Sequence, residues 1–275
     1  MVLLPQDRIV ADMYEAAERS RRAEIRNYLG MSGIGDRCAR KLWYQFRGYS
    51  PRLLEGRSIM IFDLGNRVEA AVVTWLRRAG YRVEGQQDAF EAHNGLFRGH
   101  CDGRLYGVTS RPHILEIKSA NDNKFKAFKA GGVRAVAPVY SCQVQCYMGY
   151  AGLERALFVI MNKNTCELYT ERVYFCQEDF EALHQRAYTI ISSRKPPEEG
   201  CPPDSLDCSW CDFRNHCRAP DLAVQPRRTC GTCHWLDVYG TAMRCGHQAH
   251  PMPLKRWGET CDDWLFQESV DNVPF

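Results

Sequence analysis

Two short segments decide the fold of this chain, Gly99-His100-Cys101-Asp102-Gly103 and Leu115-Glu116-Ile117-Lys118. Both lie in apolar stretches bounded by Gly, Asn and Pro, a pattern that predicts β-strands. Side chains two apart on a strand point to the same face, so we expect Glu116 and Lys118 to lie side by side. Asp102 ends or kinks the preceding strand between two glycines, and it meets them if the strands pair. The sequence therefore predicts two carboxylates and an ammonium at one place on a sheet.

The rest of the chain supplies the elements around that sheet. Ser32 is a candidate N-cap for a helix that contains Asp36 to Tyr44, and Gly80 ends the helix before the strands. We expect the other helices at 9–28, 59–79, 120–131, 137–150 and 178–194, and the strands at 81–92, 95–108, 113–119, 155–162 and 166–175. This order predicts an α/β fold with a mixed sheet flanked by helices.

The paired charges suit a hydrolytic site. Carboxylates are hard oxygen ligands, which Mg²⁺ and Mn²⁺ prefer in proteins. A neighbouring ammonium can orient or help deprotonate an attacking water, or stabilise negative charge that develops on a phosphate. Gln143 and Tyr147 are four residues apart in a predicted helix, so they share a face of it. Taken singly, Glu-x-Lys and Gly-x-x-Asp also occur on solvated strands and in ordinary turns.

The ordered combination Gly-x-x-Asp, Glu-x-Lys and Gln-x-x-x-Tyr resembles the RecB-like branch of the PD-(D/E)XK nuclease superfamily. That branch includes the CRISPR-associated RecB-like exonucleases and phage exonucleases, and the resemblance covers residues 30–220. It implies a restriction-endonuclease-like core that cleaves DNA phosphodiesters. By the same resemblance, Asp102, Glu116 and the Ile117 carbonyl bind Mg²⁺ or Mn²⁺, and Lys118 activates water. The pair Gln143 and Tyr147 is implied to contact the DNA and order the site.

Relatives also carry a His or Glu on the helix that precedes the strands. In this chain the segment Gly65-Asn66-Arg67-Val68-Glu69 occupies that place, so Glu69 is the candidate for a further metal ligand and catalytic group. The histidine of the family pattern is absent there. His100 adjoins Asp102 but is expected to point to the other strand face and to have a structural role.

The cysteines are unevenly distributed. The chain has 14, and eight of them lie between Cys201 and Cys261. The N-terminus lacks the features of a signal peptide, and no apolar run approaches the ~20 residues that a membrane span needs. We therefore expect a cytoplasmic protein, in a bacterium, an archaeon or a phage-infected host, without a membrane partner. In a reducing compartment dense cysteines indicate metal ligands, and the alternative is a disulfide-stapled secreted tail.

The first cysteine group is Cys208-Ser209-Trp210-Cys211 followed by Cys217. Three thiolates leave one position of a four-ligand site open. The iron–sulfur members of the resembled family fill it with a distant cysteine before the nuclease core, and Cys38 matches that pattern. The resemblance thus implies a 4Fe-4S cluster held by Cys38, Cys208, Cys211 and Cys217. Cys201 is a rival fourth ligand, and Zn²⁺ held by the same residues is the alternative metal.

The second group has the spacing Cys-x2-Cys-x11-Cys-x15-Cys and consists of Cys230, Cys233, Cys245 and Cys261. This spacing predicts a closed four-thiolate Zn²⁺ site, in which His234, His247 or His250 can replace one cysteine. So short a segment cannot bury a core of its own, which gives the metal a structural role. We expect a nuclease domain over 1–220, with its core at 59–195, and a small module over 226–275. The module either stabilises the domain or binds DNA or a partner.

The net charge is only +3, so basic residues are informative only where they cluster. One cluster contains Lys124, Lys126, Lys129 and Arg134, with Phe125 and Phe128 between the lysines. This mixture predicts a groove that follows the DNA backbone and offers rings for base stacking, or else a solvated helix with two core-facing rings.

Together these features predict a metal-dependent DNA exonuclease that acts in end processing, recombination, or phage or CRISPR DNA metabolism. Its partners would be single-stranded DNA or duplex ends and a recombination or CRISPR-adaptation protein. The alternatives are a catalytically silent iron–sulfur DNA-binding protein and a structure-specific or site-specific endonuclease. The oligomeric state is not specified by any of these patterns.

Overall fold

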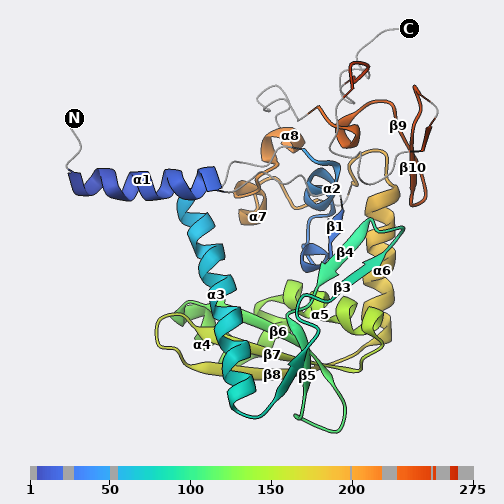
Figure 1. Ribbon diagram of the computed structural model, residues 1–275. Helices are drawn as coiled ribbons and strands as arrows, with labels where there is room; N and C mark the ends of the chain where they lie inside the picture. Colours follow the sequence, from blue (N-terminus) through green and yellow to red (C-terminus); the bar gives the residue numbers. More distant parts are fainter. Residues whose placement is uncertain are drawn as a thin grey trace.

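The computed structural model describes residues 5–20, 28–49, 55–198, 200–218, 228–248, 250–251 and 261–265. Its centre is a five-stranded sheet with helices on both faces (Figure 1). The helices are α1 (Pro5–Ser20), α2 (Ala39–Arg47), α3 (Gly56–Arg78), α4 (Asp122–Val136), α5 (Pro138–Ala151), α6 (Gln177–Ser192), α7 (Leu206–Ser209) and α8 (Arg214–Arg218). Short 3₁₀ turns are η1 (Met31–Gly33) and η3 (Cys230–Thr232). None of the described helices is long and apolar enough to span a membrane.

The strands form three sheets. The five-stranded sheet has the order β2-β5-β6-β7-β8, in which β6 and β7 are parallel and the other neighbours antiparallel. Its members are β2 (Arg82–Glu84), β5 (Gly103–Tyr106), β6 (His113–Ala120), β7 (Arg155–Asn162) and β8 (Leu168–Tyr174). The two three-stranded sheets contain β1 (Leu29–Gly30), β4 (Phe97–His100) and β3 (Ala89–Ala92), and β11 (His250–Pro251), β10 (Ala242–Cys245) and β9 (Leu236–Tyr239). The predicted α/β class with a mixed sheet is confirmed.

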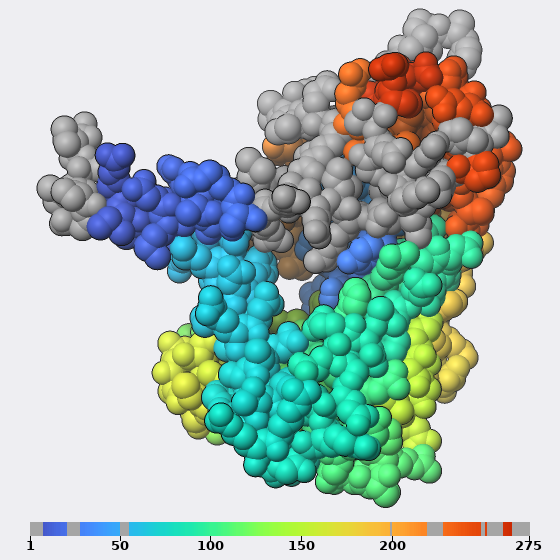
Figure 2. All heavy atoms as spheres, viewed as in Figure 1, coloured from blue at the N-terminus to red at the C-terminus, as the bar shows by residue number. Residues whose placement is uncertain are grey.

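The two faces of the central sheet bury different apolar clusters. On one face, Val68 and Val72 of α3 pack with Leu115 and Ile117 of β6. On the other face, α4 and α5 contribute side chains to the larger cluster, which also contains Ile114. Because side chains alternate along a strand, Glu116 and Lys118 belong to the α4–α5 face. Figure 2 shows α1 projecting from the body and a hollow beside α3.

Two local predictions were wrong. The stretches 81–92 and 95–108, predicted as two strands, form four short strands shared between two sheets. Gly85, with a φ of 56°, turns the chain between β2 and β3. The second break comes between β4 and β5, where the chain passes from one sheet to the other. Ser32 lies in η1, and α2 is capped instead by Cys38, whose Sγ accepts a hydrogen bond from the Lys41 amide at 3.4 Å. A thiol is a weak acceptor, so sequence rules for N-caps do not select it.

The C-terminal sheet does not stand apart from the main core. Leu236 of β9 and Met243 of β10 belong to the same buried cluster as side chains of α2 and α6. Asn94, in the turn between β3 and β4, donates a hydrogen bond to Thr241 Oγ1 at 2.9 Å. The β9–β10 hairpin is therefore packed against the end of the main body.

Candidate active site and cysteine cavities

The site begins where the chain leaves the central sheet. β5 is paired with β6 only as far as Gly103, which lies opposite Leu115. Two residues earlier, Cys101 bonds to a different segment: its amide donates to the Asp88 carbonyl at 3.2 Å, and its carbonyl accepts from the Gln87 amide at 3.0 Å. As a result, β5 does not pair with the edge of β6 that continues past Leu115.

Asp102 fills the place of that missing strand. Its Oδ2 accepts a hydrogen bond from the Ile117 amide at 2.6 Å, which fixes the carboxylate against the open edge of β6. The N–H and C=O of one strand residue point to the same side of the strand. The Ile117 carbonyl is thus directed toward the Asp102 side, and its predicted role as a metal ligand stays a prediction with favourable geometry.

Glu116 is the most deeply placed charge of the site. Its side chain is fully buried, and Oε1 forms an ion pair with the Lys118 ammonium. Oε2 has no hydrogen-bond partner in the described part of the chain. Burial, opposed by Lys118 and reinforced by Asp102, raises the pKa of Glu116 from 4.5 to about 7. A buried carboxylate oxygen without a partner is costly, and a bound cation would satisfy it.

The surroundings of Lys118 favour its charged form, whereas those of Glu116 favour the neutral form. Burial alone would lower its pKa, but the carboxylates of Glu116 and Asp102 raise that pKa above the usual lysine value. The side chain therefore remains an ammonium at neutral pH. In this state it can donate a hydrogen bond to water or to a phosphate oxygen, whereas it has no lone pair with which to accept a proton.

Glu69 reaches the same place from α3. It accepts a hydrogen bond from Gln87 Nε2 at 3.0 Å. Burial and the negative charge of Asp102 raise its pKa, while Lys118 opposes the rise. The structure therefore brings the three predicted carboxylates, Glu69, Asp102 and Glu116, within electrostatic reach of one ammonium. A divalent cation would balance that surplus of negative charge.

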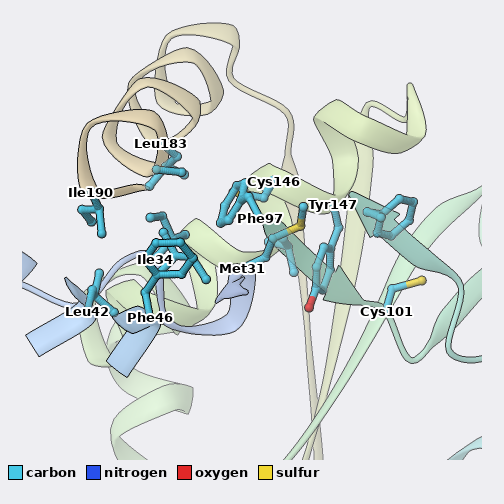
Figure 3. Close-up of a cluster of buried hydrophobic side chains, with 14 of the residues drawn as sticks. Met31, Ile34, Leu42, Phe46, Phe97, Cys101, Cys146, Tyr147, Leu183 and Ile190 are labelled. Atoms are coloured by element: carbon cyan, nitrogen blue, oxygen red, sulfur yellow. The ribbon is translucent and has the colours of Figure 1, made fainter. Parts of the chain in front are cut away.

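Gln143 and Tyr147 share one face of α5 as predicted, and Gln143 Nε2 donates to the Tyr147 hydroxyl at 3.0 Å. Only 5% of Gln143 and 1% of Tyr147 are exposed, so the implied ordering role fits them better than direct DNA contact. Gly99 makes room for the ring, because a Cβ there would lie 2.6 Å from Tyr147 Cε1. Figure 3 shows Tyr147 among the side chains of this cluster, beside Met31.

The donor set fits a hard divalent cation, although the ligands are not yet arranged around one. Within the described ranges, no group of three or more His, Cys, Asp or Glu side chains has the arrangement of an ion's ligand shell. The fit rests instead on the chemistry of the donors, which are three carboxylates and the Ile117 carbonyl at the strand edge. One of the carboxylates, that of Glu116, has an oxygen without a hydrogen-bond partner among the described residues. All are oxygen ligands of the kind that Mg²⁺ and Mn²⁺ take.

The first cysteine group lines a cavity of about 380 Å³. Five cysteines from two distant parts of the chain meet there: Cys38, Cys201, Cys208, Cys211 and Cys217. Cationic side chains line it as well, namely Arg37, Arg40, Lys41, Arg214 and Arg218. Asp36 and Asp207 also line the cavity, so cationic and anionic side chains both surround the cysteines. The structure thus places the predicted ligand Cys38 and its rival Cys201 at one cavity with the other three.

The second cysteine group lines a much smaller cavity, of about 20 Å³. Its lining includes all four predicted ligands, Cys230, Cys233, Cys245 and Cys261. His247 also lines it, and its Nε2 lies 3.6 Å from Asp263 Oδ2. His234 is not part of the lining, and the side chain of His250 lies outside the described residues. A volume of this size holds roughly one water-sized sphere.

The predicted stacking rings of α4 face the core. Phe125 and Phe128 are each 1% exposed, so they cannot stack on a base, and of the two interpretations the helix with two core-facing rings is the one confirmed. Their spacing puts both on the apolar face of α4, where burial outweighs proximity to the lysines. The ring that sequence reasoning missed is Tyr140 in the first turn of α5. The sequence signal was its spacing, since Tyr140, Gln143 and Tyr147 follow the i, i+3, i+7 pattern of one helix face.

No family model matches the chain, and no curated protein matches it. Among solved structures, that of SSO0001 has a TM-score of 0.48 at 13% identity, over 77% of this chain and 96% of that one. An alkaline exonuclease from Laribacter hongkongensis has a TM-score of 0.42 at 16% identity, over 66% and 90%. A phage-related exonuclease from Haemophilus somnus 129PT has 0.34 at 17%, over 44% and 64%. The likeness to each is partial, and the function proposed below rests on the site itself.

Proposed function

We propose that this protein is a divalent-metal-dependent deoxyribonuclease that hydrolyses phosphodiester bonds at DNA ends. The observation that carries the proposal is the buried Glu116 carboxylate, which has one oxygen paired with Lys118 and the other without a partner among the described residues. Beside it, the carboxylate of Asp102 is held in position by the Ile117 amide. A binding protein gains nothing from a buried, half-satisfied carboxylate, whereas a phosphate-cleaving site needs one.

Each side chain then has a definite task. Asp102 and Glu116 would hold Mg²⁺ or Mn²⁺ with the Ile117 carbonyl and Glu69. The bound cation supplies positive charge to the phosphate and lowers the pKa of water. Lys118, kept as an ammonium, donates to the attacking water or to a phosphate oxygen. Gln143 and Tyr147 pack behind these groups and keep them in register.

Cleavage of end-labelled linear DNA with Mg²⁺ or Mn²⁺ tests the proposal. We expect Glu116→Gln and Lys118→Met to lower the rate by about 10³-fold, the order expected when several kcal/mol of charge stabilisation is lost. Glu178→Gln, a change at the exposed start of α6, is the matched control and should cleave like the wild type. If wild type cleaves no faster than Glu116→Gln, the enzyme proposal fails. Discrete fragments from closed circular DNA would indicate an endonuclease, and binding without cleavage a silent DNA-binding protein.

We propose further that Cys38, Cys208, Cys211 and Cys217 hold a 4Fe-4S cluster, and that the second group holds one Zn²⁺. The large cavity supports the first assignment, since about 380 Å³ exceeds the space that one ion fills. The small cavity supports the second. Absorbance near 400 nm and analysis for iron and zinc test both assignments, and a colourless protein with two Zn²⁺ would contradict the first. Action in recombination, phage or CRISPR DNA metabolism remains what the resemblance implies.

A further inference from the structure

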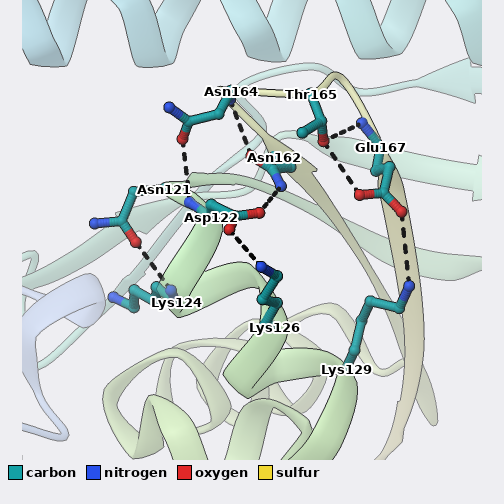
Figure 4. A network of polar contacts seen from close by, with 9 residues as sticks. All are labelled: Asn121, Asp122, Lys124, Lys126, Lys129, Asn162, Asn164, Thr165 and Glu167. Atoms are coloured by element: carbon teal, nitrogen blue, oxygen red, sulfur yellow. Dashed lines mark hydrogen bonds and ion pairs between the residues drawn. The ribbon is translucent and has the colours of Figure 1, made fainter.

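One of the cations on α4 is placed differently from the other three. Three have carboxylate partners: Lys126 with Asp122 at 2.7 Å, Arg134 with Asp179 at 3.1 Å, and Lys129 with Glu167 at 3.7 Å. Lys124 is exposed and forms no ion pair with a carboxylate in the part of the chain that the structure describes. Figure 4 shows its side chain directed away from those of Lys126 and Lys129.

Lys124 instead lies against aromatic rings close to the active site. Its Nζ is 5.1 Å from the centre of the Tyr140 ring and 5.7 Å from that of Phe128. The Nζ of Lys118 is 5.0 Å from the centre of the same Tyr140 ring. Tyr140 is thus a direct neighbour of the ammonium that the proposed reaction uses.

Tyr140 is anchored and still accessible. The buried ring of Phe128 lies stacked on it, with the ring centres 6.5 Å apart and the planes at 21°. Unlike Phe128, Tyr140 is only partly buried. Phe128 supports the ring on one side, and the ammonium groups of Lys118 and Lys124 lie over it. A planar ligand can stack on such a ring once the exposed Lys124 side chain moves away.

We propose that Tyr140 and Lys124 form the subsite for the terminal nucleotide of a DNA end. The base stacks on the Tyr140 ring, and Lys124 leaves the ring to bind the phosphate of that nucleotide. The move costs little, because an exposed cation–π contact is weak and no carboxylate holds Lys124 back. This inference rests on the proposed nuclease function and names its substrate: an unpaired terminal nucleotide of any base, since every base has a stacking face.

Binding of DNA that carries 2-aminopurine at its terminal nucleotide tests the subsite without cleavage, with the metal-free protein. We expect wild type and Tyr140→Phe to quench the fluorescence, because both keep the ring. Tyr140→Leu should lose the quenching and bind the end roughly 5- to 150-fold more weakly, the range that stacking on one ring provides. Lys124→Met should weaken binding and lower its salt dependence while part of the quenching remains.

Tyr174→Leu, at an exposed tyrosine of β8, is the matched control and should behave like the wild type. Thermal melting shows whether Tyr140→Leu is folded, and 2-aminopurine placed five nucleotides from the end should be quenched less than the terminal one. The subsite proposal is overturned if Tyr140→Leu quenches the terminal 2-aminopurine as strongly as wild type does. It is also overturned if the cleavage rate of Tyr140→Leu falls while its quenching and binding stay at the wild-type level, because the ring then only supports Lys118. Wild type that cleaves DNA without quenching overturns the subsite alone. Wild type that neither binds nor cleaves DNA overturns both proposals.

Discussion

The carboxylate site and the large cysteine cavity both collect residues from distant segments, but they are held together differently. Glu116 lies on β6, and Asp102 lies in the bend between β4 and β5, where the Ile117 amide of β6 donates a hydrogen bond to its carboxylate at 2.6 Å. Cys38 caps α2, whereas Cys208 and Cys217 lie in two very short helices far along the chain, with Cys211 between those helices. Hydrogen bonding to β6 holds the carboxylate site together, whereas packing and a bound iron–sulfur cluster would hold the large cysteine cavity together. The difference distinguishes the proposed site of chemistry from the proposed site of stabilisation.

The largest expected effect is on catalysis at the carboxylate site. Asp102→Asn keeps the shape of the side chain and removes the charge that a cation needs. We expect DNA cleavage to fall by about 10³-fold or more. The iron content and the melting temperature should stay within error of wild type, because the sheet does not depend on this charge. A loss of iron together with activity would show that the two sites are coupled, and would contradict their separate roles.

The next effect belongs to the cysteine cavity. Cys211→Ser should abolish the absorbance near 400 nm and lower the melting temperature by more than about 5 °C, since each kcal/mol lost costs about 2–4 °C at this chain length. Cys166→Ser, at an exposed cysteine that lines neither cavity, is the control. An iron-free Cys211→Ser protein that melts like wild type would contradict the stabilising role.

The rise in melting temperature that Mg²⁺ causes by binding at the carboxylate site should depend on pH. Burial raises the pKa of Glu116 to about 7 in the folded, metal-free protein, above its ordinary value of 4.5. The folded state therefore binds the extra proton, and its stabilising contribution is present below pH 4.5 and is lost as the pH rises to about 7. Mg²⁺ needs the deprotonated form, so the melting-temperature gain with Mg²⁺ should grow from pH 6 to pH 8. In Glu116→Gln this growth should be much smaller, and an equal gain at both pH values in wild type would contradict it.

The smallest effects concern the remaining cysteines. Cys245→Ser should remove one Zn²⁺ and leave iron content unchanged, because the cavity of about 20 Å³ is separate from that of about 380 Å³. Its cleavage rate should stay within about threefold of wild type, as expected for distant sites. Loss of both metals would show that the two cysteine groups do not act independently.

Cys201→Ser sharpens the ligand assignment in the large cavity. Cys201 is hydrogen-bonded to Cys38, and burial followed by the nearby Cys38 charge raises the pKa of its thiol to about 11. Burial raises the pKa of Cys211 as well, so this shift does not by itself exclude Cys201, and Cys38 is preferred because it completes the proposed ligand pattern. We therefore expect Cys201→Ser to retain its iron and Cys38→Ser to lose it, measured by iron analysis after purification under argon. The reverse result would make Cys201 the fourth ligand.

Spacing in the sequence correctly predicted which polar side chains of the candidate site share a face. Side-chain direction repeats every two residues along a strand and every 3.6 residues along a helix. These local periods were enough to predict that Glu116 and Lys118 share a face and that Gln143 lies next to Tyr147. The order of the elements was enough to predict a mixed sheet between helices. Local pattern failed where tertiary contacts decide. Phe125 and Phe128 are buried because α4 packs on the sheet, although their lysine neighbours suggested a DNA-facing surface.

Only the tertiary structure decided which distant groups meet. The partner of Asp102 is a backbone amide freed when the chain crosses from one sheet to the other, and no side-chain pattern encodes that event. The two cysteine groups carry the same Cys-x-x-Cys motif, and their different cavity volumes come from the elements packed around them. Tyr140 became a candidate only because α5 sets its ring between two lysines from other elements. Residue types specify which chemistry is available, and packing specifies which atoms are close enough to perform it.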